Sequence, residues 1–207
     1  MLSDMQNDPI ESLIGFFNRL MPLSSEENTQ VKQCFEPCVF KRRELILRAG
    51  ERCAHYMFVV QGCLRMYSDD DKGNRHIIKF APEDTWMTDI DSFFHCVPSH
   101  LYIDALEPTT IMRAELSPLV HLFMESKRIN NIFRIIAENE LTLLQRRHLE
   151  TLSSKAEERY MSFCETYPEL INRISQAQIA AYLGVTPEFL SRMKSKMLRA
   201  DKNVFLT

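Results

Sequence analysis

The chain has 207 residues, of which 45% are hydrophobic and 26% are charged, with a formal net charge of −3. This composition predicts a packed globular protein of one large or two modest domains. No apolar run approaches the ~18 residues of a membrane span. The first residues lack the basic and then apolar order of a signal peptide, so we expect a cytoplasmic protein whose six cysteines are reduced.

Charge is distributed unevenly along the chain. Residues 151–207 hold eight Lys or Arg and six Asp or Glu, a net charge of +2, while the remainder holds 17 and 22, a net charge of −5. A basic end on an acidic protein is expected where only that end meets nucleic acid.

The first part of the chain predicts helices followed by many short strands. In residues 9–37, apolar residues recur at helical spacing, and Ser24 with Glu27 fits a capping box. Between Cys38 and about Leu116, turn signals separate short apolar runs: VF, LILR, YMFVV, CLRMY, HIIKF, LYIDAL and TIMRAEL. Short strands at regular spacing favour a sandwich or barrel-like β domain.

A long helical pattern begins near Pro118. Its apolar residues step by three and four, as a coiled-coil seam does, at Ile129, Ile132, Ile136, Asn139 and Leu143. We interpret it as a dimerisation helix, and the alternative is a helix that packs only on its own β domain. Another helix is expected from Ser153-Ser154 to about Tyr167, with a core of Tyr160, Met161, Phe163 and Cys164.

Residues 174–196, ISQAQIAAYLGVTPEFLSRMKSK, have the pattern of a helix-turn-helix. Ser175 and Gln178 fit a capping box, and Gly184 suits the left-handed end of a helix. Thr186 is a good N-cap, and Pro187 suits the first helical position. Two short helices joined by a glycine turn are therefore predicted.

The second of these helices carries groups that can read base edges. Glu188, Ser191 and Arg192 share one face, and Arg binds guanine while Glu accepts from cytosine. Phe189, Leu190 and Met193 are expected to face the core. We assign phosphate contacts to Thr186, Lys194, Lys196 and Arg199, because local positive charge favours the DNA backbone. The alternative is an ordinary helical pair with a solvated charged face.

In this order, the parts resemble the Crp–Fnr family of bacterial transcription regulators over nearly the whole chain. The resemblance is carried in the strands by Ala49-Gly50-Glu51, YMFVVQG and FAPED, and later by AEERYMSFCETYPELINRISQAQIAAYLGVTPEFLSR, which looks like Bacteroidetes members. The family's Glu-x-x-Ser-Arg motif falls on Glu188, Ser191 and Arg192. Pro187 stands where the cyclic-AMP-responsive branch has a further base-reading Arg.

The resemblance implies an α+β fold in three parts: a jelly-roll-like β-roll with N-terminal helices (residues 1–117), a long dimerisation helix (118–152) and a winged-helix-type helix-turn-helix (153–207). It implies a homodimer on palindromic double-stranded DNA with TGA-like half-sites, and RNA polymerase as a candidate partner. Only residues 203–207 follow the basic turn, which leaves little room for a two-stranded wing.

Relatives that bind cyclic AMP use Gly-Glu-Leu/Ile followed by Arg-Ser/Thr-Ala. Here the first part reads Thr88-Asp89-Ile90, the second falls on Leu101-Tyr102-Ile103, and no Arg or Lys lies between Lys79 and Arg113. A buried phosphate would lack its counter-charge, so cyclic AMP is disfavoured. For another effector we single out four pocket residues, which could equally be packed or surface groups without a ligand: Trp86, Asp89, His100 and Tyr102.

The remaining chemistry is sparse, so we expect no catalytic residues, metal or cofactor. Cys34 and Cys38 lack the dense third ligand of an iron–sulfur cluster, the other cysteines are scattered, and nothing marks a haem ligand or a thiol switch. The six histidines show no metal-cupin motif, which argues against a cupin-like enzyme. The second hypothesis is a small-molecule-binding β-roll whose helix-turn-helix docks a protein instead of DNA.

Overall fold

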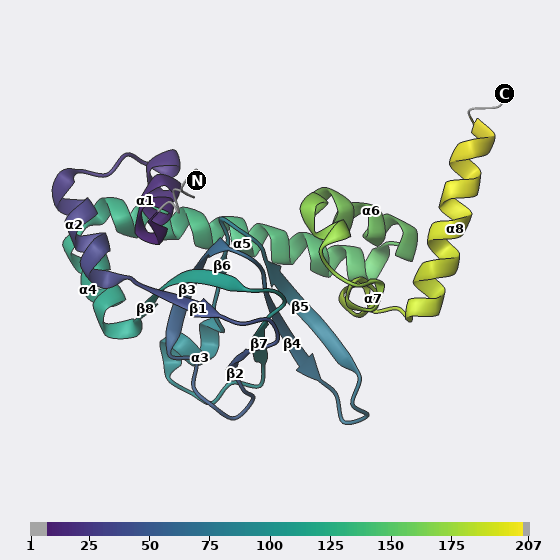
Figure 1. Cartoon of the computed structure of the whole chain (residues 1–207), viewed down its shortest axis with the longest axis horizontal. Coiled ribbons are helices and arrows are strands. Elements are labelled where there is room, and N and C mark those ends of the chain that lie inside the picture. The colour runs from purple at the N-terminus through teal and green to yellow at the C-terminus, as the bar shows by residue number, and fades with distance from the viewer. Residues whose placement is uncertain (1–7, 205–207) are drawn as a thin grey trace, which may run out of the picture. The chain divides into compact units, whose positions relative to one another are not determined.

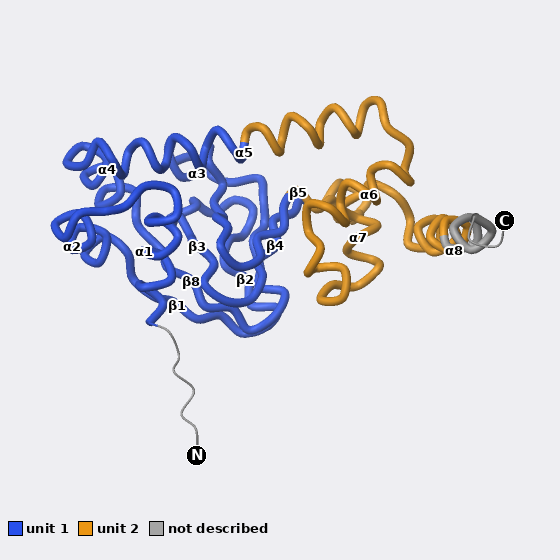
Figure 2. Tube along the Cα trace, turned by 90° about the horizontal axis from the view of Figure 1, so that it is seen from above, with its two compact units in different colours: residues 1–68, 79–140 blue, residues 69–78, 141–207 orange. Residues whose placement is uncertain are grey.

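The computed structural model describes the backbone of residues 8–204 and the side chains up to residue 197. It contains two compact units, shown in blue and orange in Figure 2. The first unit holds the described residues up to Ser68 together with residues 79–140. The second holds residues 69–78 and the chain from Leu141 onward, so both units are discontinuous in sequence.

The first unit begins with two helices, α1 (Pro9–Leu20) and α2 (Ser25–Cys34). The predicted capping box of α2 is confirmed, because Ser24 Oγ accepts from the backbone N–H of Glu27 while the Glu27 carboxylate accepts from the N–H of Ser24. The buried face of α1 packs against β3 and β8, so the helix covers one side of a sheet (Figure 1).

Two four-stranded sheets form the β-roll, with orders β1-β8-β3-β6 and β2-β7-β4-β5. Seven of the eight strands lie on the seven predicted runs, because short apolar runs between turn signals specify them well. The strands are β1 (Glu36–Phe40), β2 (Leu45–Leu47), β3 (His55–Gln61), β4 (Leu64–Asp69), β5 (Arg75–Ala81), β6 (Trp86–Met87), β7 (Tyr102–Ala105) and β8 (Thr109–Glu115). The two-residue strand β6 was not predicted, being too short to show a period.

The turn between β3 and β4 requires glycine. Gly62 has a φ of +94°, and a Cβ built there would lie 2.6 Å from the carbonyl oxygen of Pro108. Real Cβ atoms do not approach backbone this closely. The Gln61-Gly62 turn signal therefore marks both a left-handed backbone and a close crossing of β8.

An aromatic cluster fills the space between the first sheet and its helices. Phe16 and Phe17 of α1 lie 5.0 Å from the Phe58 ring and 5.9 Å from the Trp86 ring, respectively. Phe133 approaches Trp86 to 5.1 Å. Buried rings of this size each contribute several kcal/mol of hydrophobic stabilisation, about 25 cal/mol per Å² removed from water. This cluster is the main core of the first unit.

The predicted long helix is divided in two at Ser126. Helix α4 spans Leu116–Glu125 and α5 spans Lys127–Ser153. Ser126 Oγ accepts from the backbone N–H of Ile129 at 3.1 Å and donates to the carboxylate of Glu27. The serine therefore caps α5, and no Gly or Pro was needed for the break.

The second unit combines the tip of the β4–β5 hairpin, the later turns of α5 and the C-terminal helices. These helices are α6 (Ala156–Thr166), η1 (Pro168–Asn172), α7 (Gln176–Leu183) and α8 (Pro187–Val204). Helix α6 begins at Ala156 and not at Ser153, because α5 continues to Ser153. Phe163 is buried as predicted, whereas Met161 is exposed, contrary to the predicted core.

Candidate nucleic-acid interface

Helices α7 and α8 form the predicted helix-turn-helix. The Ser175–Gln178 capping box is present, and Gly184 adopts the left-handed conformation at φ +68°. Thr186 Oγ1 accepts from the backbone N–H of Phe189 at 3.2 Å, and α8 begins at Pro187. Each of these features was predicted from local chemistry, because caps and a left-handed glycine depend on only a few neighbouring residues.

A small core holds the two helices together. Four side chains point inward at helical spacing and are buried: Ile179, Leu183, Leu190 and Met193. The ring of Tyr182 lies 5.2 Å from the buried ring of Phe163 on α6. Since a fully buried Leu or Ile contributes roughly 1.5–3 kcal/mol, this core fixes the orientation of α8 relative to α7.

The three predicted base-reading residues lie together on the first turns of α8. Glu188, Ser191 and Arg192 are all exposed. Within the described part of the chain, the side chains of Glu188 and Arg192 have no hydrogen bond or ion pair. A carboxylate, a hydroxyl and a guanidinium are thus presented on one helix face, at the end of the helix that contacts base edges in helix-turn-helix proteins.

The predicted phosphate-contacting residues divide into different settings. Lys196 is exposed, but the half-buried Lys194 turns inward, donating to Gln176 Oε1 at 3.2 Å with its Nζ 5.4 Å from the Tyr160 ring. The hydroxyl of Thr186 caps α8 as an acceptor, and among the described residues its proton has no acceptor of its own. The side chain of Arg199 lies outside the described residues.

One residue of α8 departs from the prediction. Leu190 and Met193 are buried as expected, but Phe189 is 40% exposed. Neighbouring residues on a helix are turned by about 100°, so the face that buries Leu190 and Met193 leaves Phe189 at its edge. The prediction that Phe189 faces the core, which rested on its apolar side chain, is therefore wrong.

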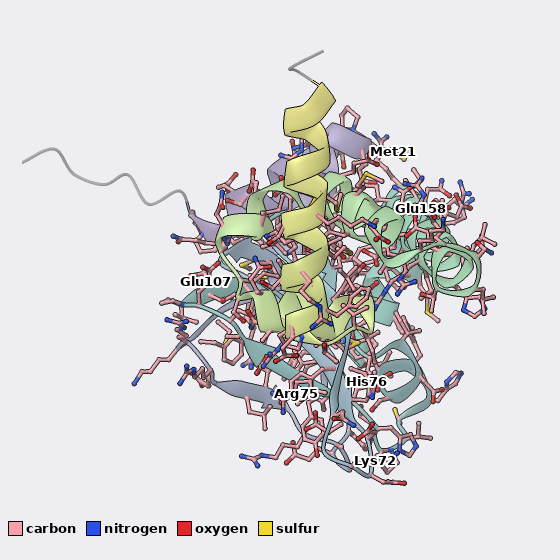
Figure 3. All side chains as sticks on the ribbon, turned by 90° about the vertical axis from the view of Figure 1, so that its right-hand side faces the viewer. Met21, Lys72, Arg75, His76, Glu107 and Glu158 are labelled. Atoms are coloured by element: carbon pink, nitrogen blue, oxygen red, sulfur yellow. The ribbon has the colours of Figure 1, made fainter. Side chains whose placement is uncertain are left out.

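Arg147 of α5 joins three segments of the second unit that sequence analysis did not connect. Its guanidinium donates to the backbone carbonyls of Ile77 and Ile78 in the hairpin and of Tyr182 in α7. The guanidinium carbon also lies 3.9 Å from the centre of the Tyr182 ring. Figure 3 shows this hairpin with Lys72 at its tip and Arg75 and His76 further along β5. Arg147 therefore fixes the helix-turn-helix to the hairpin.

The predicted dimer seam is wrong for its first residues. Ile129, Ile132 and Ile136 are buried in the first unit and form part of its own core. Another row of α5 carries exposed leucines: Leu141 is 54%, Leu144 59% and Leu152 72% exposed. The last two residues of the predicted seam, Asn139 and Leu143, are exposed, so the prediction is wrong for the three isoleucines only.

Comparisons with known proteins match this architecture. Residues 37–126 match the family model of the cyclic nucleotide-binding domain. FixK2 from Bradyrhizobium japonicum is 19% identical, with 81% of this chain and 86% of that chain covered and a TM-score of 0.68. The c-di-GMP responsive regulator CLP from Xanthomonas campestris is 13% identical, with coverage of 86% and 93% and a TM-score of 0.70.

A further solved structure, described as a transcriptional regulator of the Crp/Fnr family from Eubacterium rectale, is 15% identical, with coverage of 90% and 88% and a TM-score of 0.69. No curated protein sequence matches the chain significantly. The chain has the fold of the Crp–Fnr transcription regulators. The described residues depart from the winged-helix form in one respect: after α7 they form a single helix up to Val204, with no strands for a wing.

Within this Crp–Fnr fold, the four predicted effector residues lie in separate surroundings. Trp86 is buried in the aromatic cluster, with no hydrogen-bond partner for its indole N–H among the described residues. The Asp89 carboxylate caps α3 (Ile90–His95) and accepts from Ser99 Oγ at 2.6 Å. His100 is exposed, and the Tyr102 ring stacks on Tyr67 at 5.2 Å.

Two cations of the roll, Arg65 and Lys79, are paired with carboxylates. Arg65 and Asp104 form a buried two-point ion pair, with Nε to Oδ1 at 2.9 Å. The ammonium group of Lys79 on β5 pairs with the carboxylate of Glu140 on α5, and desolvation lowers the pKa of Lys79. An anionic ligand at either cation would compete with a carboxylate already in place.

The cysteine side chains are dispersed over the fold. None of the six cysteines, all of which lie in the described part of the chain, forms a disulfide, and burial raises the pKa of Cys34 to about 12, which suppresses thiolate formation. No group of three or more metal-ligating side chains gathers within the described residues. Across the same residues, we find no helix with the length and apolar character of a membrane span.

Proposed function

We propose that the chain is a homodimeric, sequence-specific DNA-binding transcription regulator. The observation that carries the proposal is the exposed set Glu188, Ser191 and Arg192 on the first turns of α8, with no partner for the two charged side chains among the described residues. We propose that Arg192 binds guanine through O6 and N7 and that Glu188 accepts from cytosine N4. The likeness to the Crp–Fnr fold supports this reading.

The same observations favour DNA over a docked protein as the partner. A protein interface would favour an apolar centre with charge excluded from it, whereas this face places a carboxylate beside a guanidinium with Lys196 one turn further on. A β-roll protein that only docks another protein would show no salt-dependent DNA binding, which makes salt dependence a direct test between the two functions.

The deciding experiment is selection from random duplex DNA with the full chain, followed by affinity measurements for wild type and Arg192→Ala. We expect an enriched palindrome, and we expect Arg192→Ala to lose about 1–3 kcal/mol on that site and to relax one base position. Arg146→Ala, an exposed arginine on α5, is the matched control and should bind as wild type. Equal losses on selected and random DNA would contradict base reading by Arg192.

The dimer is proposed to form along the exposed row of α5 that contains Leu141, Leu144 and Leu152. Exposed leucines on one helix face are expected to pair with a second copy, because burying them removes apolar surface from water. We expect Leu141→Gln with Leu144→Gln to shift the sedimentation equilibrium toward monomer. Arg146→Gln, on another face of α5, should leave it unchanged. A dimer unaffected by the double substitution would contradict this interface.

For the effector, the roll's chemistry disfavours cyclic AMP. No Arg or Lys occurs between Lys79 and Arg113, and Lys79 already pairs with Glu140. We therefore propose that any effector of the roll is a molecule other than cyclic AMP, because this segment has no arginine to bind the cyclic phosphate. Isothermal titration of the full chain with cyclic AMP checks this, and micromolar binding would contradict it.

A further inference from the structure

The recognition helix carries one apolar side chain that neither the core nor the proposed base-reading set explains. Phe189 is 40% exposed, and it is the only exposed large hydrophobic residue in the helix-turn-helix, residues 175–197. No aromatic ring contact involves it within the described residues. A lone exposed apolar residue is ordinary on a protein surface, so its position on the helix decides whether it has a role.

That position is in the first turn of α8, beside the base-reading residues. Phe189 follows Glu188 directly. It precedes Arg192 by three residues and Lys196 by seven, so Phe189, Arg192 and Lys196 share one side of the helix. Its backbone N–H is held by Thr186 Oγ1, which fixes the first turn. Phe189 thus lies on the edge of the exposed face, where its neighbours are a guanidinium and an ammonium group.

The core cannot take up this ring without loss. Leu190 and Met193 already occupy the inward positions and are buried. A rotation of α8 that buried Phe189 would expose Leu190 and Met193, because all side chains of a helix turn together. An aromatic ring held at the outer edge of a DNA-reading helix meets the wall of the major groove, where the one apolar group is the C5-methyl of thymine.

We propose that Phe189 is a specificity-determining residue that contacts a thymine methyl group beside the bases read by Glu188 and Arg192. This inference rests on the proposed DNA-binding function. It predicts that the protein distinguishes thymine from uracil at one position of its half-site, because these bases differ only in that methyl. Discrimination of about fourfold is expected, the value of burying one methylene-sized group.

The test is a cycle between protein and DNA substitutions, performed with the full chain on the selected palindrome. Each thymine of one half-site is replaced in turn by deoxyuridine. Wild type should lose about fourfold in affinity at one thymine, and Phe189→Ala should show no loss there. Phe189→Leu should restore the sensitivity in part, and Arg192→Ala should bind more weakly but keep the full methyl effect.

The outcomes separate this inference from the proposed function. Sequence-specific binding that is insensitive to every deoxyuridine, or equally sensitive in wild type and Phe189→Ala, overturns the role of Phe189 while leaving the regulator intact. A selected half-site without thymine at any position has the same meaning. A wild-type chain with no sequence-specific binding overturns the proposed function, and the inference with it.

Discussion

The buried charges of the β-roll and the exposed charges at the start of α8 differ in their partners. In the roll, the buried Arg65 pairs with Asp104, Lys79 pairs with Glu140 of α5, and the Asp89 carboxylate accepts from Ser99 Oγ. On α8, Glu188 and Arg192 are left exposed without partners among the described residues. Charges that are paired within the fold contribute to its stability, whereas exposed charges without a partner are available to bind another molecule. This contrast supports the proposal that α8 contacts DNA.

The largest effect is expected from breaking a pair in the roll. Asp104→Ala leaves the buried guanidinium of Arg65 without its carboxylate, and an uncompensated buried charge costs about 3–5 kcal/mol. Urea unfolding should show the loss. The control is the double variant Arg65→Met with Asp104→Ala, which removes both charges and should recover most of the stability. A double variant as unstable as Asp104→Ala would show that the pair does not hold the roll together through charge matching.

A smaller effect is expected at Arg147, which bonds to carbonyls of β5 and α7. Arg147→Met keeps the apolar stem but removes the donors, and we expect a loss of about 2 kcal/mol, within the range for hydrogen bonds to charged groups. Hydrogen exchange should increase in both the hairpin tip and α7. Arg146→Met serves as the exposed control. Faster exchange in only one of the two segments would contradict a joint role.

The capping box of α7 should contribute about 1 kcal/mol. Ser175→Ala removes the acceptor for the N–H of Gln178, whereas Ser175→Asp retains one. Thermal unfolding should separate the two variants, with Ser175→Asp close to wild type. Equal destabilisation by both would show that the box does not stabilise α7 through its side-chain acceptor.

The smallest expected effect is on the salt dependence of DNA binding. It distinguishes Lys194 from Lys196, both of which were predicted to contact phosphate. Lys196→Ala should reduce the salt slope of DNA binding by about 1, because the exposed ammonium releases one counterion on phosphate contact. Lys194→Ala should change the slope less and stability more, since that side chain contacts Gln176 and Tyr160. Identical slopes for both variants would remove the distinction.

Local chemistry made much of this molecule predictable. The strand runs, both capping boxes, the left-handed Gly184 and the caps of α8 depend on short spacings, and all are present. The break at Ser126 was missed because the cap signal lacked an accompanying Gly or Pro. It could have been found from the serine three residues before the buried Ile129.

What could not be predicted concerns partners distant in sequence. The periodicity of α5 revealed an apolar row, but it could not tell that Ile129, Ile132 and Ile136 face their own unit while Leu141 and Leu144 face outward. Likewise, Phe189 scored as core because it is apolar, and its exposure depends on how α8 rotates on α7. The contacts of Arg147 were not predicted, because its acceptors are backbone carbonyls, which carry no side-chain signature.

The bonds of Arg147 also bear on the order in which the chain folds during synthesis. The bond from Arg147 to Ile77 spans 70 residues, and the bond to Tyr182 spans 35 more. The hairpin tip therefore leaves the ribosome long before the arginine and the helix that complete its unit. Closing so long a loop costs entropy, so we expect the roll to fold first and the second unit to be completed only when α7 emerges.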